Sequence, residues 1–461
     1  MKRFRWFVVL LVVGTIAVSC GRSDKTNTNN ASGTSTTAAS GASDKCKSET
    51  LKDTEVGVTA STITIEVMAD VGSPLAPGLF QGNVDAVNAF AKYWNAHGGI
   101  GCRQVTVKVW DSKLSAEESK NGLIDGCKNV VAMVGDNSLF NPDITPLTGC
   151  ADKAGAATGL PDMAALATDI HEQCAKGVYM IQAVAEHCPV ATGVRPLRAM
   201  VGPFKYLVSQ SKDKLHGLFM VPGDLPTTVQ SATTLIESQR QSGITFDDTA
   251  KVSGRDPQAS YTPKVQSIKD HNSNYVYNGS NDTAEVRIRK EAKAQGVDSV
   301  KVWGCSLACY TKTFIANGGA DVEGTYVWMQ FLPFEEASAN KEAALYVESV
   351  GADKVDSFGA QAWQAAVAFK TAVDNIVASD GPNAITRANL LKAFDGMKDF
   401  DANGWLGKKD LKGFGACYVL MQVKNSKWVR VYPEKTGTFD CTASNVVDVN
   451  LDTVAEAAKI K

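Results

Sequence analysis

The sequence predicts an α/β protein with parallel sheets, divided into two domains of ordinary size. Strand-like and helix-like patterns alternate along most of the chain, which is typical of βα units with right-handed crossovers and helices on both faces of a sheet. Once the first 45 residues are set aside, roughly 415 of the 461 residues remain, enough for two hydrophobic cores.

The strand predictions rest on short apolar patterns. Ile63, Ile65 and Val67 alternate with other residues at a period of two, and three valines in 105–109 do the same. Residues 130–134 are continuously apolar, as in a parallel strand buried on both faces. Strands are therefore expected at residues 62–70, 105–109, 130–134, 179–181, 218–221, 275–277, 300–303 and 326–331.

The helix predictions rest on apolar residues spaced three and four apart. Val84, Val87, Phe90 and Trp94 share one face of a helix expected over 79–97. A possible capping box of Ser115 and Glu118 opens the next helix. The last third is expected to hold helices at 335–351, 357–379 and 386–397, followed by a hairpin of 417–423 and 428–431 that turns at Asn425 and Ser426.

The N-terminus has the pattern of a secretory signal peptide over residues 1–19. A basic start precedes an apolar run of about 13 residues, which is too short to span a bilayer. Small residues before Cys20 resemble a bacterial lipobox, although the position usually held by Leu is Ala17. We expect Cys20 to be lipidated; the alternative is an ordinary cleaved signal with a coincidental cysteine.

Residues 20–45 are expected to form a disordered tether between that lipid and the folded body. The segment after Cys20 is rich in Ser, Thr, Asn and Gly and has no large apolar residue, so it cannot offset the entropy of ordering. The protein would then be held at the outer face of the bacterial cell membrane by its acyl chains alone.

The charge balance excludes some partners. The chain has 47 basic and 49 acidic residues and a formal net charge of −2, which gives no indication of nucleic-acid binding. Sequence patterns for a nucleophile elbow, a phosphate loop and a His-Glu-x-x-His zinc helix are all missing. We therefore expect a binding protein without a cofactor, and not an enzyme.

The cysteine count suggests disulfides. Of the 11 cysteines, ten remain after Cys20, and an even number in an exported protein suggests up to five bridges. Metal ligation is the alternative, but Cys305 and Cys309 have no second close pair beside them and the histidines are scattered. No metal site is expected.

Five segments resemble motifs of one known family in their order and spacing. They are residues 94–101 leading to a strand that ends in Asp111, 131–135, 159–161, 261–266 and 318–324. In these segments the chain resembles the type I substrate-binding proteins of the branched-chain amino acid and amide class, such as leucine/isoleucine/valine-binding proteins, which supply ABC importers. The resemblance covers about residues 60–435.

The resemblance implies two doubly wound parallel-sheet lobes joined by three hinge segments, with ligand in the cleft between them. Lobe one would comprise residues 60–185 plus 333–412, lobe two residues 186–332 plus 413–445, and the hinges would lie near 184–188, 331–334 and 409–415. The expected partners are a small polar solute, such as an amino acid or amide, and ABC permease subunits, and the expected state is a monomer. The alternative is a surface solute sensor with the same fold and no transport role.

Candidate ligand-binding residues follow the strands, because ligands of open parallel sheets bind beyond the carboxyl ends of the strands. They are Asp136, Asn137, Ser138, Ala165, Ala167 and Thr168 in lobe one, and Gly223, Asp224, Asn278, Gly279, Ser280, Cys305 and Ser306 in lobe two. Each could instead be a loop or capping residue. Ser138 and Thr168 match the positions at which the family contacts ligand through hydroxyl and amide groups.

The chain departs from the family pattern at one position. Amino-acid binders of the family place a carboxylate after the strand that corresponds to 300–303, where it pairs with the ligand ammonium, but residues 304–307 contain no acid. Asp224 or Asp136 could substitute. Because a buried ammonium without a charged partner is costly, this favours amides, polyols or other neutral solutes.

The resemblance also suggests one disulfide, since a pair at the place of Cys102 and Cys127 occurs in the family. Cys417 and Cys441 flank the terminal hairpin, and Cys305 and Cys309 could close a small loop. Cys46, Cys150, Cys174 and Cys188 cannot be paired from sequence, although Cys174 with Cys188 is the shorter option.

Overall fold

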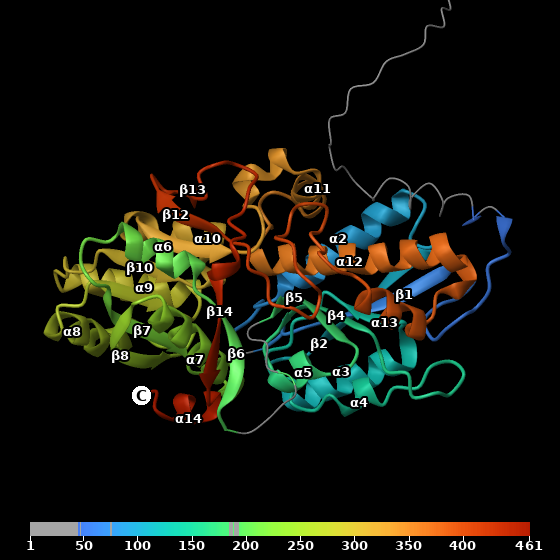
Figure 1. Ribbon diagram of the computed structural model, residues 1–461, viewed down its shortest axis with the longest axis horizontal. Helices are drawn as coiled ribbons and strands as arrows, with labels where there is room; N and C mark the ends of the chain where they lie inside the picture. The colour runs from blue at the N-terminus through green and yellow to red at the C-terminus, as the bar shows by residue number, and fades with distance from the viewer. Residues whose placement is uncertain (1–44, 47, 74–75, 184–187, 189–192) are drawn as a thin grey trace, which may run out of the picture.

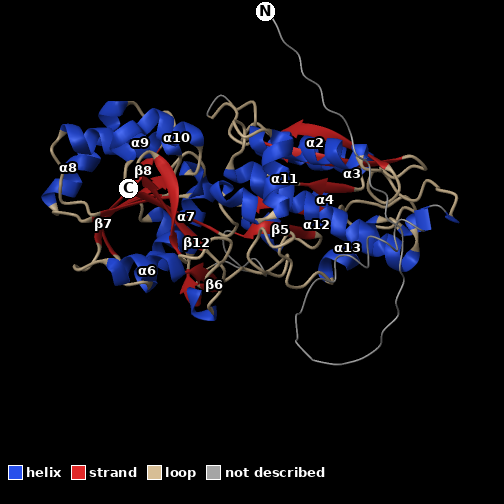
Figure 2. Cartoon of the chain, turned by 90° about the horizontal axis from the view of Figure 1, so that it is seen from above, coloured by secondary structure: helices blue, strands red, loops and turns tan. Residues whose placement is uncertain are grey.

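The computed structural model describes residues 45–46, 48–73, 76–183, 188 and 193–461. The predicted signal peptide of 1–19, the lipidated Cys20 and all of the 20–45 tether except its last residue lie outside the described residues. Two α/β lobes lie side by side along the long axis of the molecule, and both views show helices flanking the strands of each lobe (Figures 1 and 2). Within the described part of the chain, no helix is both long and apolar enough to cross a membrane.

The first lobe contains a five-stranded, fully parallel sheet in the order β2-β1-β3-β4-β5. Its strands are β1 (Thr62–Ala69), β2 (Gln104–Asp111), β3 (Ala132–Val134), β4 (Asp162–Ala167) and β5 (Val178–Ala183). Two long helices cover one face, α2 (Gln81–Ala96) and α12 (Ser357–Asp380), with α13 (Arg387–Asp395) beside α12. The other face carries α3 (Ala116–Asn129), α4 (Thr145–Thr148) and α5 (Ile170–Cys174).

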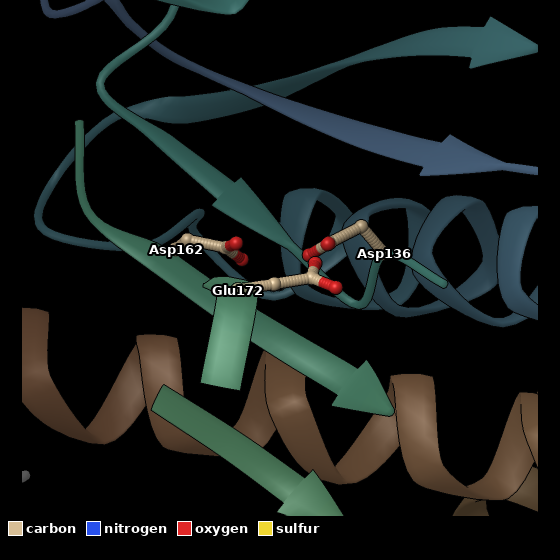
Figure 3. A group of neighbouring side chains, drawn as sticks. All are labelled: Asp136, Asp162 and Glu172. Atoms are coloured by element: carbon tan, nitrogen blue, oxygen red, sulfur yellow. The ribbon is translucent and has the colours of Figure 1, made fainter. Parts of the chain in front are cut away.

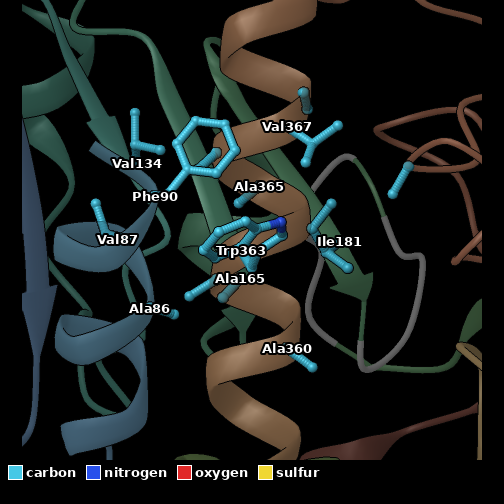
Figure 4. Packing of buried hydrophobic residues seen from close by; sticks show 14 of the residues in the cluster. Ala86, Val87, Phe90, Val134, Ala165, Ile181, Ala360, Trp363, Ala365 and Val367 are labelled. Carbon is cyan, nitrogen blue, oxygen red and sulfur yellow. The ribbon is translucent and has the colours of Figure 1, made fainter. Parts of the chain in front are cut away.

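Small residues let α12 lie close to the sheet and to α2. Ala362, Ala365 and Ala366 are fully buried, and the larger Trp363 on the same helix fills the space beside Phe90 (Figure 4). The two rings meet edge to face with centroids 5.0 Å apart, a favoured aromatic geometry. This core holds α2 and α12 against one face of the lobe-one sheet.

The second lobe contains a seven-stranded sheet in the order β13-β12-β11-β10-β9-β7-β8. Its strands are β7 (His216–Pro222), β8 (Thr245–Val252), β9 (Tyr275–Asn278), β10 (Val302–Cys305), β11 (Thr325–Met329), β12 (Val419–Lys424) and β13 (Lys427–Tyr432). The last two form the predicted antiparallel hairpin at one edge. Its helices are α6 (Gly202–Gln210), α7 (Pro226–Gln241), α8 (Thr262–Asp270), α9 (Asp282–Ala294) and α10 (Lys312–Gly318).

Several elements were not anticipated from sequence. β6 (Arg195–Met200) pairs antiparallel with β14 (Val446–Leu451) in a ribbon between the lobes, and α14 (Thr453–Ala458) follows it. The helix expected over 335–351 is divided into a 3₁₀ segment, Phe334–Ala339, and α11 (Lys341–Val350). Asn340 causes the break, because its side chain accepts a hydrogen bond from the Ala343 N–H at 2.9 Å and starts a new helix.

Two of the segments that cross between the lobes run side by side. The Gly407 N–H donates to the Gln330 carbonyl at 2.8 Å, and the Leu332 N–H donates to the Trp405 carbonyl at 2.9 Å. Further along, the Met180 N–H of β5 donates to the Leu411 carbonyl at 3.0 Å. These contacts lie at or beside the hinges expected near 331–334 and 409–415, whereas most of the hinge at 184–188 lies outside the described residues.

The structure contains five disulfides among the ten cysteines it describes. The predicted pair Cys102–Cys127 is wrong: Cys102 bonds Cys46, and Cys127 of α3 bonds Cys150 after α4. The Cα separations of 5.5 and 5.6 Å are normal for disulfides. The remaining bridges, Cys174–Cys188, Cys305–Cys309 and Cys417–Cys441, agree with the sequence analysis.

Candidate ligand-binding cleft

Two adjoining chambers lie between the lobes. The inner chamber, of about 140 Å³, is lined by the end of β5, β6, the middle of α7, Gly279, Trp328 and Phe414. The outer chamber, of about 210 Å³, is lined by Phe140 and residues 168–171 of lobe one and by Pro226, Thr227, Gln230 and Ser231 of lobe two. Ser231 borders both chambers. Each volume is below the roughly 300–1,000 Å³ of sites for drug-sized ligands, so each chamber suits only a small solute.

The inner chamber combines an apolar wall with a row of hydroxyls. Met200, Leu235, Trp328 and Phe414 supply the apolar wall. Thr228, Ser231, Thr234 and Ser238 supply the hydroxyls from one face of α7, where residues three and four apart are neighbours.

Most of these hydroxyls already donate to backbone carbonyls. Ser231 donates to the Thr228 carbonyl at 3.0 Å, and Thr228 donates to the Leu225 carbonyl at 2.9 Å. Their lone pairs can therefore accept hydrogen bonds from a ligand, but their protons are engaged. Thr234 differs, since its buried hydroxyl has no hydrogen-bond partner among the described residues.

The outer chamber is more polar, but its acid is already paired. The Asp169 carboxylate accepts hydrogen bonds from the N–H of His171 and from its ring Nδ1, both at 2.9 Å. Arg195 donates through Nη2 to the Thr453 hydroxyl at 2.8 Å. Thr168, which lies between β4 and α5, also lines this chamber.

The lobes touch at the edge of the cleft. The Thr227 hydroxyl, at the start of α7, donates to the Leu139 carbonyl of lobe one at 2.8 Å. This bond holds the N-terminus of α7 against the loop that follows β3, so the described form has its two lobes in contact.

Of the residues predicted in lobe one, only Thr168 lines a chamber. Asp136, Asn137 and Ser138 are no more than 1% exposed, and the Ser138 hydroxyl lies 2.7 Å from that of Ser119. The chain turns inward just before them at Gly135, whose φ is +74°. A side chain there would meet Val87 Cγ2 at 2.7 Å, so the turn requires glycine.

Ala165 and Ala167 lie within β4 and do not follow it. Their side chains are fully buried in the hydrophobic clusters on the two faces of the sheet. The sequence analysis did not assign this strand, because an alanine-rich strand has little β-branched or aromatic character to mark it.

Asp224 does not line either chamber in this form. It is exposed after β7, where one oxygen accepts from the Ser253 hydroxyl at 2.6 Å and the other from the Gly254 N–H at 3.2 Å. Asp136 is buried, so neither acid proposed as a substitute borders a chamber.

The other residues predicted in lobe two mainly stabilise loops, apart from Gly279 in the inner chamber. Asn278 is fully buried and donates to the Asn281 carbonyl at 2.8 Å. Ser306 donates to the Ser280 carbonyl at 2.6 Å. Gly223 lies beside Lys251, and Cys305 is in a disulfide.

Sequence reasoning missed the residues of α7, β6 and the crossing segment. Ser231, Thr234, Arg198, Trp328 and Phe414 all line the inner chamber. A signal was present in α7, whose hydroxyl residues recur at helical spacing and mark a polar face. Arg198 and Phe414 carry no such local signal.

A two-lobed α/β architecture with a small-molecule cleft between the lobes defines a class of ligand-binding proteins. The profile of the family described as "Periplasmic binding protein" matches residues 62–427, and the chain belongs to this family. Membership places it among binding proteins and not among enzymes, as the sequence analysis expected. None of the curated proteins compared with the chain matches it.

Several solved structures share the fold. A leucine-binding protein from Thermotoga maritima is 12% identical, covers 80% of this chain and 97% of its own, and has a TM-score of 0.61. A branched-chain amino acid ABC transporter protein from Thermus thermophilus with bound valine is 14% identical, with 82% and 97% coverage and a TM-score of 0.63. A fatty acid ABC transporter substrate-binding protein from Thermomonospora curvata is 15% identical, with 83% and 97% coverage and a TM-score of 0.60. These likenesses confirm the type I periplasmic binding protein fold.

Proposed function

We propose that this protein captures a small solute between its lobes outside the cytoplasm and delivers it to the permease of an ABC importer. The observation that carries the proposal is the pair of adjoining chambers, bordered by both lobes and by a segment that crosses between them. Membership of the periplasmic binding protein family supports the same function.

We further propose that the protein is anchored by lipid at Cys20. A Cys20→Ala variant that still appears in the membrane fraction, as wild type does, would contradict this anchoring.

We propose a neutral or anionic solute with an aliphatic body. The inner chamber offers an apolar wall and the unpaired Thr234 hydroxyl. Each chamber has an arginine in its lining: Arg198, which lies 3.5 Å from Asp448, and Arg195, which donates to Thr453. The one acid among the described residues that lines a chamber, Asp169, is paired with His171. An α-amino acid would bring an ammonium group that needs a charged or multiply hydrogen-bonded partner. The names of the structural relatives, which include a valine complex and a fatty acid binder, agree with an aliphatic ligand.

Thermal unfolding of the purified chain with candidate solutes tests this function. The screen should include branched-chain amino acids, the corresponding 2-oxo acids, short fatty acids, amides and polyols. A solute at 100 times its dissociation constant should stabilise the protein by about 2.7 kcal/mol. Small-angle scattering should then show a changed radius of gyration if the proposed lobes, 60–185 plus 333–412 and 186–332 plus 413–445, move about their hinges.

Ser231→Phe is expected to weaken solute binding more than ten-fold. The residue borders both chambers, so the larger ring fills the space that a ligand would occupy. Isothermal titration calorimetry with the solute from the screen measures the loss. Ser209→Phe is the matched control, because that exposed serine on α6 also donates to the carbonyl three residues earlier, Tyr206. Equal affinity in Ser231→Phe and wild type would place the ligand elsewhere.

Thr234→Val and Thr168→Val should each weaken binding by about 1–3 kcal/mol, because each leaves a polar ligand atom unpaired in a closed cleft. Ser138→Ala should leave affinity unchanged, since that hydroxyl lies beside Ser119 and away from both chambers. Calorimetry on the three variants distinguishes a ligand in the chambers from a ligand beside Ser138. A loss confined to Ser138→Ala would restore the site expected from the family and reject the chambers.

A further inference from the structure

Three carboxylates from separate parts of lobe one converge in its interior (Figure 3). Asp136 follows β3, Asp162 begins β4 and Glu172 lies on α5. One oxygen of each lies within 4.8 Å of the others, and the side chains are 1%, 1% and 0% exposed, respectively. This cluster lies outside both chambers of the cleft.

The cluster lacks a counter-charge in the protein. Across the described residues, none of its six carboxylate oxygens has a hydrogen-bond partner, and no ion pair joins them to a basic side chain. Burial raises the pKa of all three acids, and repulsion from neighbouring carboxylates raises the pKa of Asp162 and Glu172 further. Buried charges without a partner are strongly unfavourable, so a cation or protons must neutralise this cluster.

Asn141 provides an independent indication of a bound ligand. Its side chain is 1% exposed, and neither its amide oxygen nor its nitrogen has a hydrogen-bond partner in the described part of the chain. It faces Glu172 closely enough to oppose the rise in the pKa of that carboxyl. This buried amide lies beside Glu172, and a rotation about its last bond would present its oxygen, in place of its nitrogen, to a cation bound there; oxygen donors are the ligands of hard cations.

We propose that Asp136, Asp162, Glu172 and Asn141 bind one calcium ion. Calcium takes oxygen ligands at about 2.3–2.6 Å, so oxygens on opposite sides of it are separated by up to about 5 Å. The oxygens of the cluster lie within 4.8 Å of one another, inside that limit. Magnesium usually keeps several waters and is bound through only one or two carboxylates, which does not suit a fully buried cluster of three. Calcium is therefore favoured over magnesium.

The ion would link the cluster to the wall of the cleft. Glu172 and His171 lie on the same short helix, α5, which follows Thr168. His171 and Thr168 line the outer chamber. Holding Glu172 to β3 and β4 through a shared cation would therefore fix the lobe-one wall of that chamber. The proposal does not depend on which solute the cleft takes.

Metal analysis of the full chain tests the site directly. Protein unfolded and refolded in EDTA, then dialysed against calcium chloride, should hold one calcium per chain by mass spectrometry. Calcium should raise the melting temperature by several degrees, and magnesium or sodium should raise it less. Absence of bound calcium together with an unchanged melting temperature would overturn the site, and an equal response to magnesium would overturn the choice of ion.

Two variants connect the response to the cluster. Asp162→Asn and Glu172→Gln should each weaken calcium binding at least ten-fold. Neither should lower the melting temperature in EDTA, because each removes one of three crowded charges. Glu285→Gln is the matched control, since Glu285 is also a fully buried carboxylate but lies on α9 of lobe two, outside this group. Calcium binding that survives in both variants would overturn the assignment.

Discussion

Arg387→Leu is expected to lower the free energy of unfolding by about 3–5 kcal/mol. Arg387 is the first residue of α13 and is fully buried. Its guanidinium donates to the carbonyls of Val130 and Ala151 at 2.6 Å and of Cys127 at 2.8 Å. Leucine fills part of the space but leaves these carbonyls buried and unpaired. Urea denaturation at pH 7 measures the loss.

Two variants make this prediction specific. Arg387→Lys keeps the charge but lacks the planar fork that reaches several acceptors, so its loss should be smaller but clear. Arg240→Leu on α7 is the control, because Arg240 is half-exposed and lies 3.8 Å from Glu237, a geometry worth little. If Arg387→Leu and Arg240→Leu cost the same, the carbonyl contacts of Arg387 do not stabilise the fold.

The order of strands and helices could be predicted because each depends on local pattern. The alternation at Ile63, Ile65 and Val67 placed β1, and the helical spacing around Phe90 placed α2. The β6–β14 ribbon could not be predicted, because its two strands lie more than 200 residues apart and no local pattern connects them. The pairing of Cys102 with Cys46 and of Cys127 with Cys150 was missed for the same reason, since disulfide pairing depends on proximity in space.

The site was less predictable than the fold. The rule that ligands bind after parallel strands found Thr168 and Gly279, but it also selected residues that cap loops or face the interior. A loop residue that lines a cavity and one that closes a turn, such as Asn278, have the same composition. Which of them faces the cleft is decided by backbone turns like that at Gly135 and by the packing of α7 against the other lobe.

Glu285 is a buried carboxylate whose substitution is expected to change the pH dependence of stability strongly. It lies on α9, is fully buried, and neither carboxylate oxygen has a hydrogen-bond partner within the described residues. Burial raises its pKa to about 8, and Arg289 on the next turn opposes this only in part. The guanidinium of Arg289 is itself engaged, donating through Nε to the Asp321 carbonyl at 2.6 Å. The phenols of Tyr261 and Tyr277 are the other titratable groups close to Glu285, and both have raised pKa values.

Glu285→Gln should therefore stabilise the protein increasingly as the pH rises. The folded pKa lies above the unfolded one, so the wild-type carboxyl contributes stability below about pH 4.5 and loses it progressively until the pH passes about 8. Each pKa unit corresponds to about 1.4 kcal/mol. The variant has no proton to lose, so its advantage over wild type should grow by about 3–4 kcal/mol between pH 5 and pH 8. Urea denaturation of both proteins at four pH values measures this growth.

Glu291→Gln on the same helix provides the control with the opposite sign. Glu291 is partly exposed, and hydrogen bonds from Gln295, Thr262 and Gln258 lower its pKa. Its contribution is present above the unfolded pKa and lost only in acid, so this variant should show no growing advantage between pH 5 and pH 8. A constant difference between Glu285→Gln and wild type across that range would mean that Glu285 ionises normally. Its carboxylate would then have to be solvated, and α9 could not pack against the sheet as it does in this structure.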